Sequence, residues 1–422
     1  MGTPTESLQE FLPGADYATV VAMRKRNAIP QWDSAHPHGM MITKGEGPYL
    51  EGYVERDGEA IPVRAVDGHG QILCNSAGYK NPEIEEARQV ARDSGLDATA
   101  TNFHNPIVEW AREALLSSLP SEWRDEYLQY FLTSGTEAND TLRRAALAQG
   151  NGLAEFINLR KGYSGAGYAA NAACGNPGWK GNSTPTIPGM HFTDPDPEDL
   201  MRVLSDIPSG RNMAAMFEAG NLGVGGFFDI HDEFLRFLIE KVSTKDGGAY
   251  PDEVQTGLGR TGTTFWASER IFEGMEPPEG ISIAKGVGGN HRAAAVFIRK
   301  DVAEKIKGLI YNTFAQNLED LAAMGTVVNM AQRDNWTQNA AARGAQLTEG
   351  FEQKVRPASA IEFTTHGRGL MFGVRLDTAN RVNAVLRQAP LDGWICGKGG
   401  VDSRVLRIAP PINITEEVTA EL

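Results

Sequence analysis

Short runs of apolar residues alternate with segments of helical period over residues 127–300. The short runs, each of which predicts a buried strand, are residues 127–132, 156–159, 213–217, 281–284 and 294–298. The segments between them, such as residues 136–149 and 231–241, space their apolar positions as helices do. Strands that alternate with helices are typical of a mainly parallel sheet with helices on both faces. The pattern therefore predicts an α/β protein.

The two ends of the chain follow other patterns. Residues 1–45 predict an arm in which Pro30, Pro37 and Gly39 interrupt regular structure, and residues 45–73 predict small antiparallel strands joined by turns. Helices are predicted at residues 7–11, 18–26, 82–94, 106–119, 318–333 and 338–354. Strands are predicted at residues 368–376 and 405–408.

These patterns divide the chain into three predicted parts. Residues 1–75 form an N-terminal arm and part of a small domain, residues 76–317 form the large α/β domain, and residues 318–422 form the α+β remainder of the small domain. A chain of 422 residues is long enough for more than one domain.

Composition and charge narrow the class of protein. The chain is 41% hydrophobic and 22% charged, as globular proteins are, and its net charge of −14 argues against a surface for nucleic acid or anionic membrane. The three cysteines are far apart and form no CxxC pair, so neither a disulfide framework nor a metal site is expected. The first residues lack the pattern of a signal peptide, and no run approaches the about 18 apolar residues of a membrane span. We expect a cytoplasmic protein.

The first candidate for chemistry is Lys285. It follows a short apolar run and precedes glycines, which would hold its amine in place with little flanking bulk. A desolvated amine can attack a carbonyl and form a Schiff base. On the local pattern alone, a surface lysine at the end of a strand is the more common case.

A second candidate is the strand end at residues 131–139, Phe-Leu-Thr-Ser-Gly-Thr-Glu-Ala-Asn. A helix that begins after such a strand presents free backbone N–H groups at its positive end, which is a site for phosphate. The hydroxyls of Ser134 and Thr136 would add donors, and Gly135 would let a ligand approach the backbone. The alternative is a capping box formed by Ser134 and Glu137, which needs no ligand.

The third candidate is Asp252, in the motif Asp-Glu-Val-Gln-Thr-Gly-Leu-Gly-Arg-Thr-Gly at residues 252–262. An acid at the end of a central strand lies where open α/β sheets bind ligands. Buried there, it needs a cationic partner such as a protonated heterocyclic nitrogen; the alternative is an acid that caps a loop. Tyr163 supplies an aromatic ring that could stack on a planar group, although a core or turn tyrosine is as common.

Together these motifs resemble the class III pyridoxal-phosphate (PLP) aminotransferases over roughly residues 40–420. The resemblance is carried by Ser134-Gly135-Thr136-Glu137-Ala138-Asn139, Tyr163-x-Gly165, residues 252–262, Ala284-Lys285-Gly286, Asn312-Thr313-Phe314 and Arg407-x-x-Pro410-Pro411. Residues 261–266 and 311–314 look most like the alanine–glyoxylate aminotransferase 2 branch, which also holds amino-alcohol phosphate phospholyases. The implied fold is PLP-dependent transferase fold type I, with a seven-stranded, mainly parallel sheet in the large domain.

The resemblance implies roles for the candidate residues. Lys285 would form the aldimine with the cofactor and, once displaced by substrate, move the proton between the substrate's Cα and the cofactor. Asp252 would pair with the pyridinium nitrogen. Gly135 and Thr136 would hold the phosphate at the helix start, with Ser134 nearby.

Further residues are implied by the same resemblance. Val254 would pack against one face of the ring and Tyr163 would stack on the other, with Gln255 also at the cofactor. Thr313 would reach the phosphate bound by a neighbouring subunit, which implies a homodimer or a tetramer of dimers. Arg407 matches the arginine that binds the substrate's α-carboxylate in many members.

The chain departs from the family's pattern at several places. Ser164 replaces a histidine, and residues 218–223 replace a Glu-Pro-Ile-Gln-Gly segment, so that the expected glutamine has only Asn221 as a candidate. Pro251 stands in the strand before the acid, and residues 290–292 lack the family's proline–glycine pair.

The function implied is that of an aminotransferase, which moves an amino group from an amino acid or amine to a small 2-oxo acid such as pyruvate or glyoxylate in a ping-pong cycle. A lyase of the phospholyase type or an epimerase on the same scaffold is the alternative, because one carbanion can eliminate a β-group or be reprotonated on its other face. Arg407 favours a substrate with a carboxylate. A third class, a PLP-binding regulator or scaffold without turnover, is disfavoured by the presence of both Lys285 and Asp252.

Overall fold

The structure is a computed structural model that describes residues 4–29, 39–181, 183–243 and 247–422. Its main sheet has seven strands in the order β4-β12-β11-β10-β7-β5-β6. The strands are β4 (Tyr127–Leu132), β12 (Ala294–Arg299), β11 (Gly280–Ile283), β10 (Gly248–Asp252), β7 (Met213–Glu218), β5 (Glu155–Leu159) and β6 (Met190–Thr193). Strand β12 runs antiparallel to both of its neighbours, whereas the remaining pairs are parallel. The predicted seven-stranded, mainly parallel sheet is confirmed.

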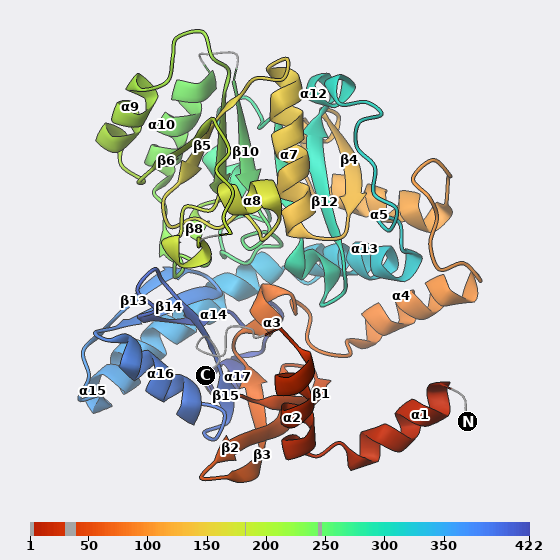
Figure 1. The fold of residues 1–422 in the computed structure, drawn as a ribbon, viewed down its shortest axis with the longest axis vertical. Coiled ribbons are helices and arrows are strands. Elements are labelled where there is room, and N and C mark those ends of the chain that lie inside the picture. The colour runs from red at the N-terminus through yellow and green to blue at the C-terminus, as the bar shows by residue number, and fades with distance from the viewer. Residues whose placement is uncertain (1–3, 30–38, 182, 244–246) are drawn as a thin grey trace.

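Both faces of this sheet are buried, as strand β7 shows. Ala214 and Met216 pack in the cluster beneath helix α7 (Gly135–Gln149), and Ala215 and Phe217 pack in the cluster on the opposite face, with helix α10 (Asp232–Ser243). Alternate residues of a strand point to opposite faces, so an unbroken apolar run is the expected pattern for a strand covered twice. Figure 1 shows α7 lying across one face of the sheet.

Two four-stranded sheets lie beside the large one (Figure 1). The first contains β1 (Met41–Glu46), β2 (Tyr49–Arg56), β3 (Glu59–Asp67) and β15 (Trp394–Ile395), and the second contains β13 (Phe363–Arg368), β14 (Met371–Leu376), β17 (Val405–Ile408) and β16 (Gly397–Gly399). Strand β15 pairs with β3 in parallel, so the two ends of the chain share a sheet. The boundaries predicted at residues 75 and 317 stay predictions.

The longer helices lie close to the predicted ranges. They are α1 (Pro4–Phe11), α2 (Tyr17–Asn27), α4 (Pro82–Asp93), α5 (Pro106–Ser117), α13 (Leu318–Arg333) and α14 (Trp336–Gly350). Two further helices, α9 (Pro197–Ser205) and α16 (Ala379–Gln388), were not predicted. Shorter elements are α3 (Gly70–Leu73), α6 (Ser121–Arg124), α8 (Tyr168–Ala172), α11 (Ala267–Ile271), α12 (Lys300–Lys305), α15 (Arg356–Ala358), α17 (Glu416–Thr419), β8 (Asn221–Leu222) and β9 (Phe228–Asp229). None of the helices in the described ranges is long and apolar enough to cross a membrane.

Three predictions about the chain's ends need comment. The strand predicted at residues 368–376 is the end of β13, a turn and then β14, because Gly369 takes a left-handed φ of +53° that reverses the chain. The strands predicted up to residue 73 end at Asp67, and Gly70–Leu73 forms a helical turn instead. The interruption assigned to Pro30 and Pro37 lies outside the described residues.

Pro251 is accommodated in central strand β10 because of the way the ladder alternates. The carbonyl of Asp252 accepts from Ala219 on the β7 side, and the next amide, that of Glu253, donates to Ser282 on the β11 side. Residue 251 therefore also faces β11, where the ladder pairs only Asp252 with Ser282. Proline has no N–H to donate, and an N–H at residue 251 would face β11, with which β10 forms almost no hydrogen-bond ladder.

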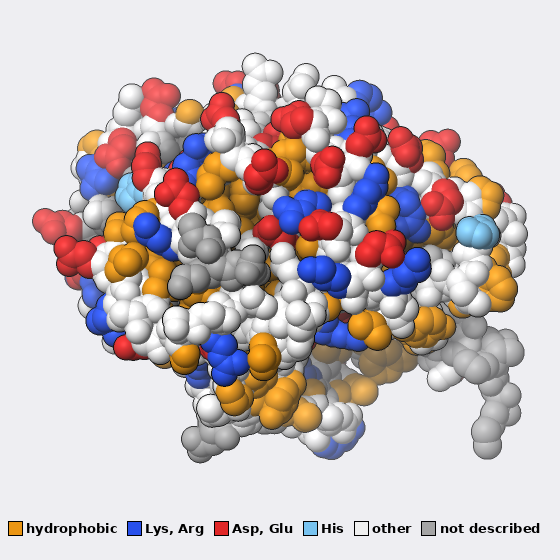
Figure 2. Space-filling model, turned by 90° about the horizontal axis from the view of Figure 1, so that it is seen from above, with side chains coloured by type: hydrophobic (Ala, Val, Ile, Leu, Met, Phe, Trp, Pro, Cys, Tyr) orange, Lys and Arg blue, Asp and Glu red, His pale blue; other side chains and the backbone are white. Residues whose placement is uncertain are grey.

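The surface carries mixed charge. Figure 2 shows acidic and basic side chains intermingled over the face that it presents. Opposite charges at such spacing screen one another, so this face lacks the single-sign field that attracts a polyanion.

Candidate active site

The two predicted catalytic residues lie at the ends of neighbouring strands. Asp252 is the last residue of β10 and pairs with Ser282 of β11. Lys285 follows β11 and opens a 3-10 turn, Lys285–Gly288, in a left-handed conformation with φ +52°. For a residue other than glycine this conformation costs on the order of 1–3 kcal/mol, and it persists only where its surroundings enforce it. The structure thus brings both residues to the edge where open α/β sheets bind ligands.

The carboxylate of Asp252 is held by two donors. Nδ2 of Asn139 donates to Oδ2 at 2.7 Å, and the amide of Val254 donates to Oδ1 at 2.9 Å. Asn139 is itself fixed by the hydroxyl of Ser282, which donates to its Oδ1 at 2.7 Å. Burial raises the pKa of the Asp252 carboxyl, while these donors and the charge of Lys285 oppose the rise. A carboxylate removed from water in this way is stabilised by a cationic partner.

Helix α7 begins beside Val254 and Ala284. A β-carbon on Gly135 would lie 3.0 Å from both γ-carbons of Val254 and 3.4 Å from the β-carbon of Ala284, so glycine is required for this close approach. The predicted capping box is only half formed: Ser134 Oγ accepts from the amide of Glu137 at 3.2 Å, but the Glu137 carboxylate turns back to Thr133. The amides of Gly135 and Thr136 come before Glu137 and have no acceptors within the helix, an arrangement that suits an anion.

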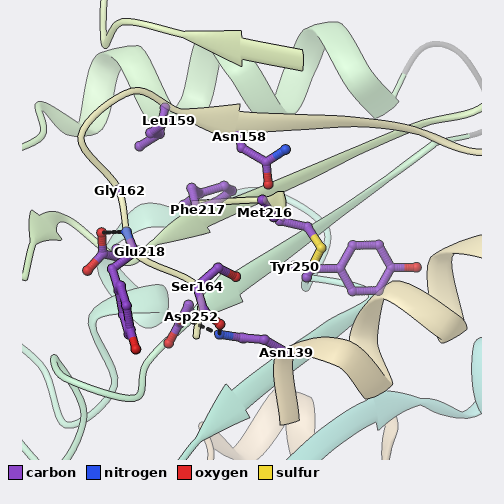
Figure 3. A pocket seen from close by; sticks show the side chains of 12 residues that line it. Asn139, Asn158, Leu159, Gly162, Ser164, Met216, Phe217, Glu218, Tyr250 and Asp252 are labelled. Carbon is purple, nitrogen blue, oxygen red and sulfur yellow. Dashed lines mark hydrogen bonds between the residues drawn. The ribbon is translucent and has the colours of Figure 1, made fainter. Parts of the chain in front are cut away.

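A pocket of about 330 Å³ that opens to solvent lies beside Asp252, lined by residues of β5, β7 and β10, by Asn139 of α7 and by residues 162–164. Figure 3 shows Asn139, Ser164, Glu218 and Asp252 gathered at its wall, with the amide of Asn139 turned to the carboxylate of Asp252. The predicted stacking residue, Tyr163, also lines this pocket. Burial raises the pKa of the Tyr163 phenol to about 12, so the ring is uncharged at neutral pH.

Tyr163 is fixed from two sides. Its ring packs edge-on against Trp179, with the centroids 5.0 Å apart. Its amide donates to Oε2 of Glu218 at 3.0 Å. The ring position is therefore set before any ligand is bound.

Glu218 is a site residue that sequence reasoning left without a role. Its Oε1 accepts from the amide of Gly223 at 2.8 Å, so one buried carboxyl joins the Tyr163 loop to residues 218–223. Burial, together with the charge of Asp252, raises the pKa of Glu218 to about 8. The signal available in the sequence was an acid at the end of an apolar run, as at Asp252.

The expected glutamine is not replaced by Asn221. The Asn221 amide donates to Asp229 at 2.6 Å across the β8–β9 pair. Gln255 instead approaches the site: its Nε2 donates to Glu218 Oε1 at 3.4 Å, and its buried Oε1 has no hydrogen-bond partner within the described chain.

Arg407, on β17, reaches the same loop from the second small sheet. It is buried, its Nη1 donates to the carbonyl of Gly223 at 3.4 Å, and its guanidinium lies 5.4 Å from the ring centre of Phe227. Its Nε has no hydrogen-bond partner among the residues described. Burial lowers the pKa of Arg407 to about 10, so the guanidinium still carries its charge at neutral pH. A cation with unused donors beside the pocket can bind a carboxylate.

The chain after Lys285 is fastened to a segment that sequence analysis did not single out. The hydroxyl of Ser76 donates to the carbonyl of Gly286 at 2.6 Å, and the amide of Asn290 donates to the carbonyl of Cys74 at 2.8 Å. These contacts span residues far apart in sequence, so no local pattern could have revealed them.

Thr313 is the predicted site residue that lies apart from the others. It is exposed in the segment before α13, beside the exposed aromatics Tyr311 and Phe314. Among the described residues, no hydrogen bond joins Thr313 to Lys285 or Asp252.

The residues present fit pyridoxal phosphate. A helix start with free amides suits a phosphate, and Gly135 permits close approach to it. Asp252 is a buried carboxylate that lacks a cation in hydrogen-bond contact within the described residues, which suits a protonated ring nitrogen. Lys285 lies on the next strand end, where its amine can meet a carbonyl carbon. Three functional groups of one small molecule thus have counterparts at one sheet edge.

Comparison with known proteins gives a consistent result. A family model, aminotransferase class-III, matches residues 31–422. The chain is 27% identical to "Alanine--glyoxylate aminotransferase 2 homolog 2, mitochondrial" of Arabidopsis thaliana, covering 96% of this chain and 85% of that protein. It is also 27% identical to acetylornithine aminotransferase of Bacillus subtilis, covering 90% of this chain and 92% of that protein.

Solved structures agree in fold. Ornithine aminotransferase from Toxoplasma gondii superposes with a TM-score of 0.84 at 21% identity, over 100% of this chain and 96% of that one. A transaminase from the marine bacterium Virgibacillus gives a TM-score of 0.81 at 18% identity, over 95% and 96% of the two chains. With a family model that spans nearly the whole chain, the conclusion is direct: this chain belongs to the class III aminotransferases, enzymes that use pyridoxal 5′-phosphate.

Proposed function

We propose that the protein transfers an amino group from an amino acid or amine to a small 2-oxo acid, such as pyruvate or glyoxylate, in a ping-pong cycle. The observation that carries this proposal is the position of Arg407. It is a buried cation with an unused donor, and it contacts Gly223, whose amide donates to Glu218 in the wall of the pocket. Both an amino acid and a 2-oxo acid carry the carboxylate that such a guanidinium binds.

Each site residue has a distinct task in this proposal. When bound, pyridoxal phosphate supplies a carbonyl carbon that accepts the amino group and a ring that accepts electrons from the substrate's Cα. Lys285 would hold the cofactor and then carry the proton away from Cα on its Nζ. Asp252 would keep the ring nitrogen protonated, because a carboxylate at hydrogen-bond distance favours the charged ring.

The remaining residues would bind and orient. The amides of Gly135 and Thr136, with the hydroxyl of Ser134 nearby, would hold the phosphate at the start of α7. Val254, which already contacts the position of Gly135, would pack on one face of the ring and Tyr163 on the other. Gln255 would use its unpartnered Oε1 toward the cofactor.

We also propose a homodimer or larger assembly in which Thr313 serves the neighbouring subunit. The exposure of Tyr311 (64%) and Phe314 (72%) supports this, since large aromatic side chains gather at interfaces. The cytoplasmic location predicted from the sequence stays a prediction.

Omission of the acceptor tests the reaction type. The enzyme is incubated with amino donors and without a 2-oxo acid, and the cofactor spectrum and free ammonia are followed. A transaminase converts its cofactor to the amine form in one equivalent and stops, and it resumes when pyruvate or glyoxylate is added. Continuous release of ammonia with a carbonyl product, in the absence of any acceptor, would show a lyase instead.

A further inference from the structure

A buried arginine stands on the helix that begins the candidate phosphate site. Arg143 lies on α7, one turn after Asn139, and is only 3% exposed. The buried side of the helix is largely apolar, with Ala138, Leu142, Ala145 and Ala146, and its other buried polar residues are Asn139 and Thr141. A guanidinium is costly to bury, by several kcal/mol when it is poorly paired, so its presence in an apolar layer needs a reason.

The contacts of Arg143 lead to Ser164. Nη2 donates to the hydroxyl of Ser164 at 2.5 Å, and Nη1 donates to Asp140 at 3.3 Å. The Asp140 side chain is one-third exposed, which makes it a weak partner for a buried charge. Nε has no hydrogen-bond partner within the described ranges. The local ion pair therefore does not account for the arginine.

Ser164 connects Arg143 to the carboxylate of the site. The Ser164 carbonyl accepts from Nδ2 of Asn139 at 3.0 Å, and the same Nδ2 donates to Asp252 at 2.7 Å. Arg143 thus donates to the hydroxyl of Ser164, and Asn139 donates to its carbonyl. Ser164 and Asp252 line the same pocket (Figure 3), and Ser164 follows Tyr163 in the chain.

The charges around Asp252 make the arginine's effect specific. Burial raises the pKa of the Asp252 carboxyl, and the neighbouring Glu218 is a second acid in the same wall. Lys285 and Arg143 are the cations whose fields lower that pKa. Lys285 is the residue proposed to bond to the cofactor, whereas Arg143 takes no part in that bond. Arg143 therefore contributes a positive charge near Asp252 that does not depend on the state of Lys285.

We propose that Arg143 is a positioning residue that keeps Asp252 ionised in its buried pocket, so that the pocket binds the cofactor ring in its protonated form. This inference rests on the proposed role of Asp252. Without the guanidinium, the pKa of Asp252 would rise further, and at low pH a larger share of the molecules would meet the ring nitrogen with a neutral acid. The pocket would then lose the charge pair that selects the protonated ring, and the loss would deepen as the pH falls.

The test measures how tightly the apo-protein binds pyridoxal phosphate, by equilibrium dialysis between pH 6 and 9. Arg143→Gln removes the charge but can still donate to Ser164, Arg143→Met is a second neutral variant, and Arg143→Lys keeps the charge. Arg144→Gln is the matched control, because Arg144 is the next residue on α7 and is exposed. The ratio of variant to wild-type affinity cancels the cofactor's own titration.

Arg143→Gln is expected to weaken binding most at pH 6 and progressively less toward pH 9, because loss of the guanidinium raises the pKa of Asp252 and a protonated Asp252 binds the charged ring less well. Arg143→Met should show the same pH dependence, and Arg143→Lys and Arg144→Gln should stay close to wild type at every pH. A ratio that does not change with pH, or an equal loss in the lysine and glutamine variants, would show a purely structural role and overturn the inference. Failure of the wild-type protein to bind the cofactor would instead refute the assignment of the site.

Discussion

Asp252 and Ser282 face each other across β10 and β11, and this pairing sets the distance between the site's carboxylate and its lysine. Ser282 also donates to Asn139, which donates to Asp252, so one residue fixes the strand register and the orientation of the carboxylate. Because Lys285 follows Ser282 through a left-handed turn, a shift of this register would change the distance between Lys285 and Asp252.

Lys285→Ala should abolish the visible absorption that a lysine-bound pyridoxal cofactor gives, together with amino transfer. The reason is that no other described residue at the end of β11 has a side-chain amine. Absorption spectra of the purified proteins decide the matter. Lys80→Ala is the matched control, since Lys80 also adopts a left-handed backbone, with φ +54°, but is exposed. A colourless wild-type protein, or a Lys285→Ala protein that keeps the band, would refute the assignment.

Gly135→Ala should weaken cofactor binding by about tenfold or more. The added β-carbon would stand 3.0 Å from both γ-carbons of Val254, so the start of α7 must shift away from the site. Dissociation constants for pyridoxal phosphate measure the effect. The double variant Gly135→Ala with Val254→Ala removes the colliding methyl groups and should recover part of the affinity. Additive losses in the double variant would mean that the collision is not the cause.

Arg407→Ala should lower kcat/KM for amino-acid donors by about 10–100-fold, as expected when a charge-assisted hydrogen bond worth about 1.5–3 kcal/mol is lost. Amine donors without a carboxylate should be affected much less. Steady-state kinetics with paired donors, one an amino acid and one the matching amine, separate the two cases. Arg375→Ala, on the neighbouring strand and paired with Asp402 at the surface, serves as the control. Equal losses for both donors would argue against carboxylate binding.

Glu218 should make folding stability depend on pH. Burial, with the charge of Asp252, raises its pKa from an ordinary 4.5 to about 8. Between these values the folded protein holds more protons than the unfolded chain, so its free energy of unfolding falls as the pH rises through this window. Glu218→Gln removes this dependence. In this variant the side-chain NH₂ group of the glutamine also faces the backbone amide of either Tyr163 or Gly223, and two donors that face each other cost about 1–3 kcal/mol.

The free energy of unfolding of the wild-type protein should therefore exceed that of Glu218→Gln, and the difference should be larger at pH 5 than at pH 8.5. Urea unfolding at the two pH values measures this difference, with exposed Glu113→Gln as the control. An advantage that grew with pH would mean that Glu218 is ionised in the folded protein and that the sign of the shift is opposite.

The features that sequence analysis predicted are those encoded locally. The helix Leu318–Arg333 lies at the predicted range because its apolar positions keep a helical period, and in the structure Asn317 caps its start. Ser134–Thr136, Asp252 and Lys285 were found because each stands at the junction of a strand with a turn or helix, where side-chain type and backbone geometry are coupled.

The features that it missed depend on contacts between distant segments. Glu218 acquires its partners from Tyr163 and Gly223 only when two strand ends meet. Arg143 has the sequence signature of an ordinary helix arginine, and its burial appears only when α7 lies on the sheet. The short strands β15 and β16 contain too few residues to show any period.

The parallel pairing of β15 with β3 has a consequence for how the chain is made. Trp394 and Ile395 complete a sheet whose other strands lie within residues 41–67. During synthesis, β1, β2 and β3 therefore leave the ribosome well before β15. The edge of β3 has no partner strand until nearly the whole polypeptide has emerged. Such late closure slows folding and leaves a strand edge open to aggregation, so a chaperone that shields nascent chains would raise the yield of this protein more than that of one with local contacts.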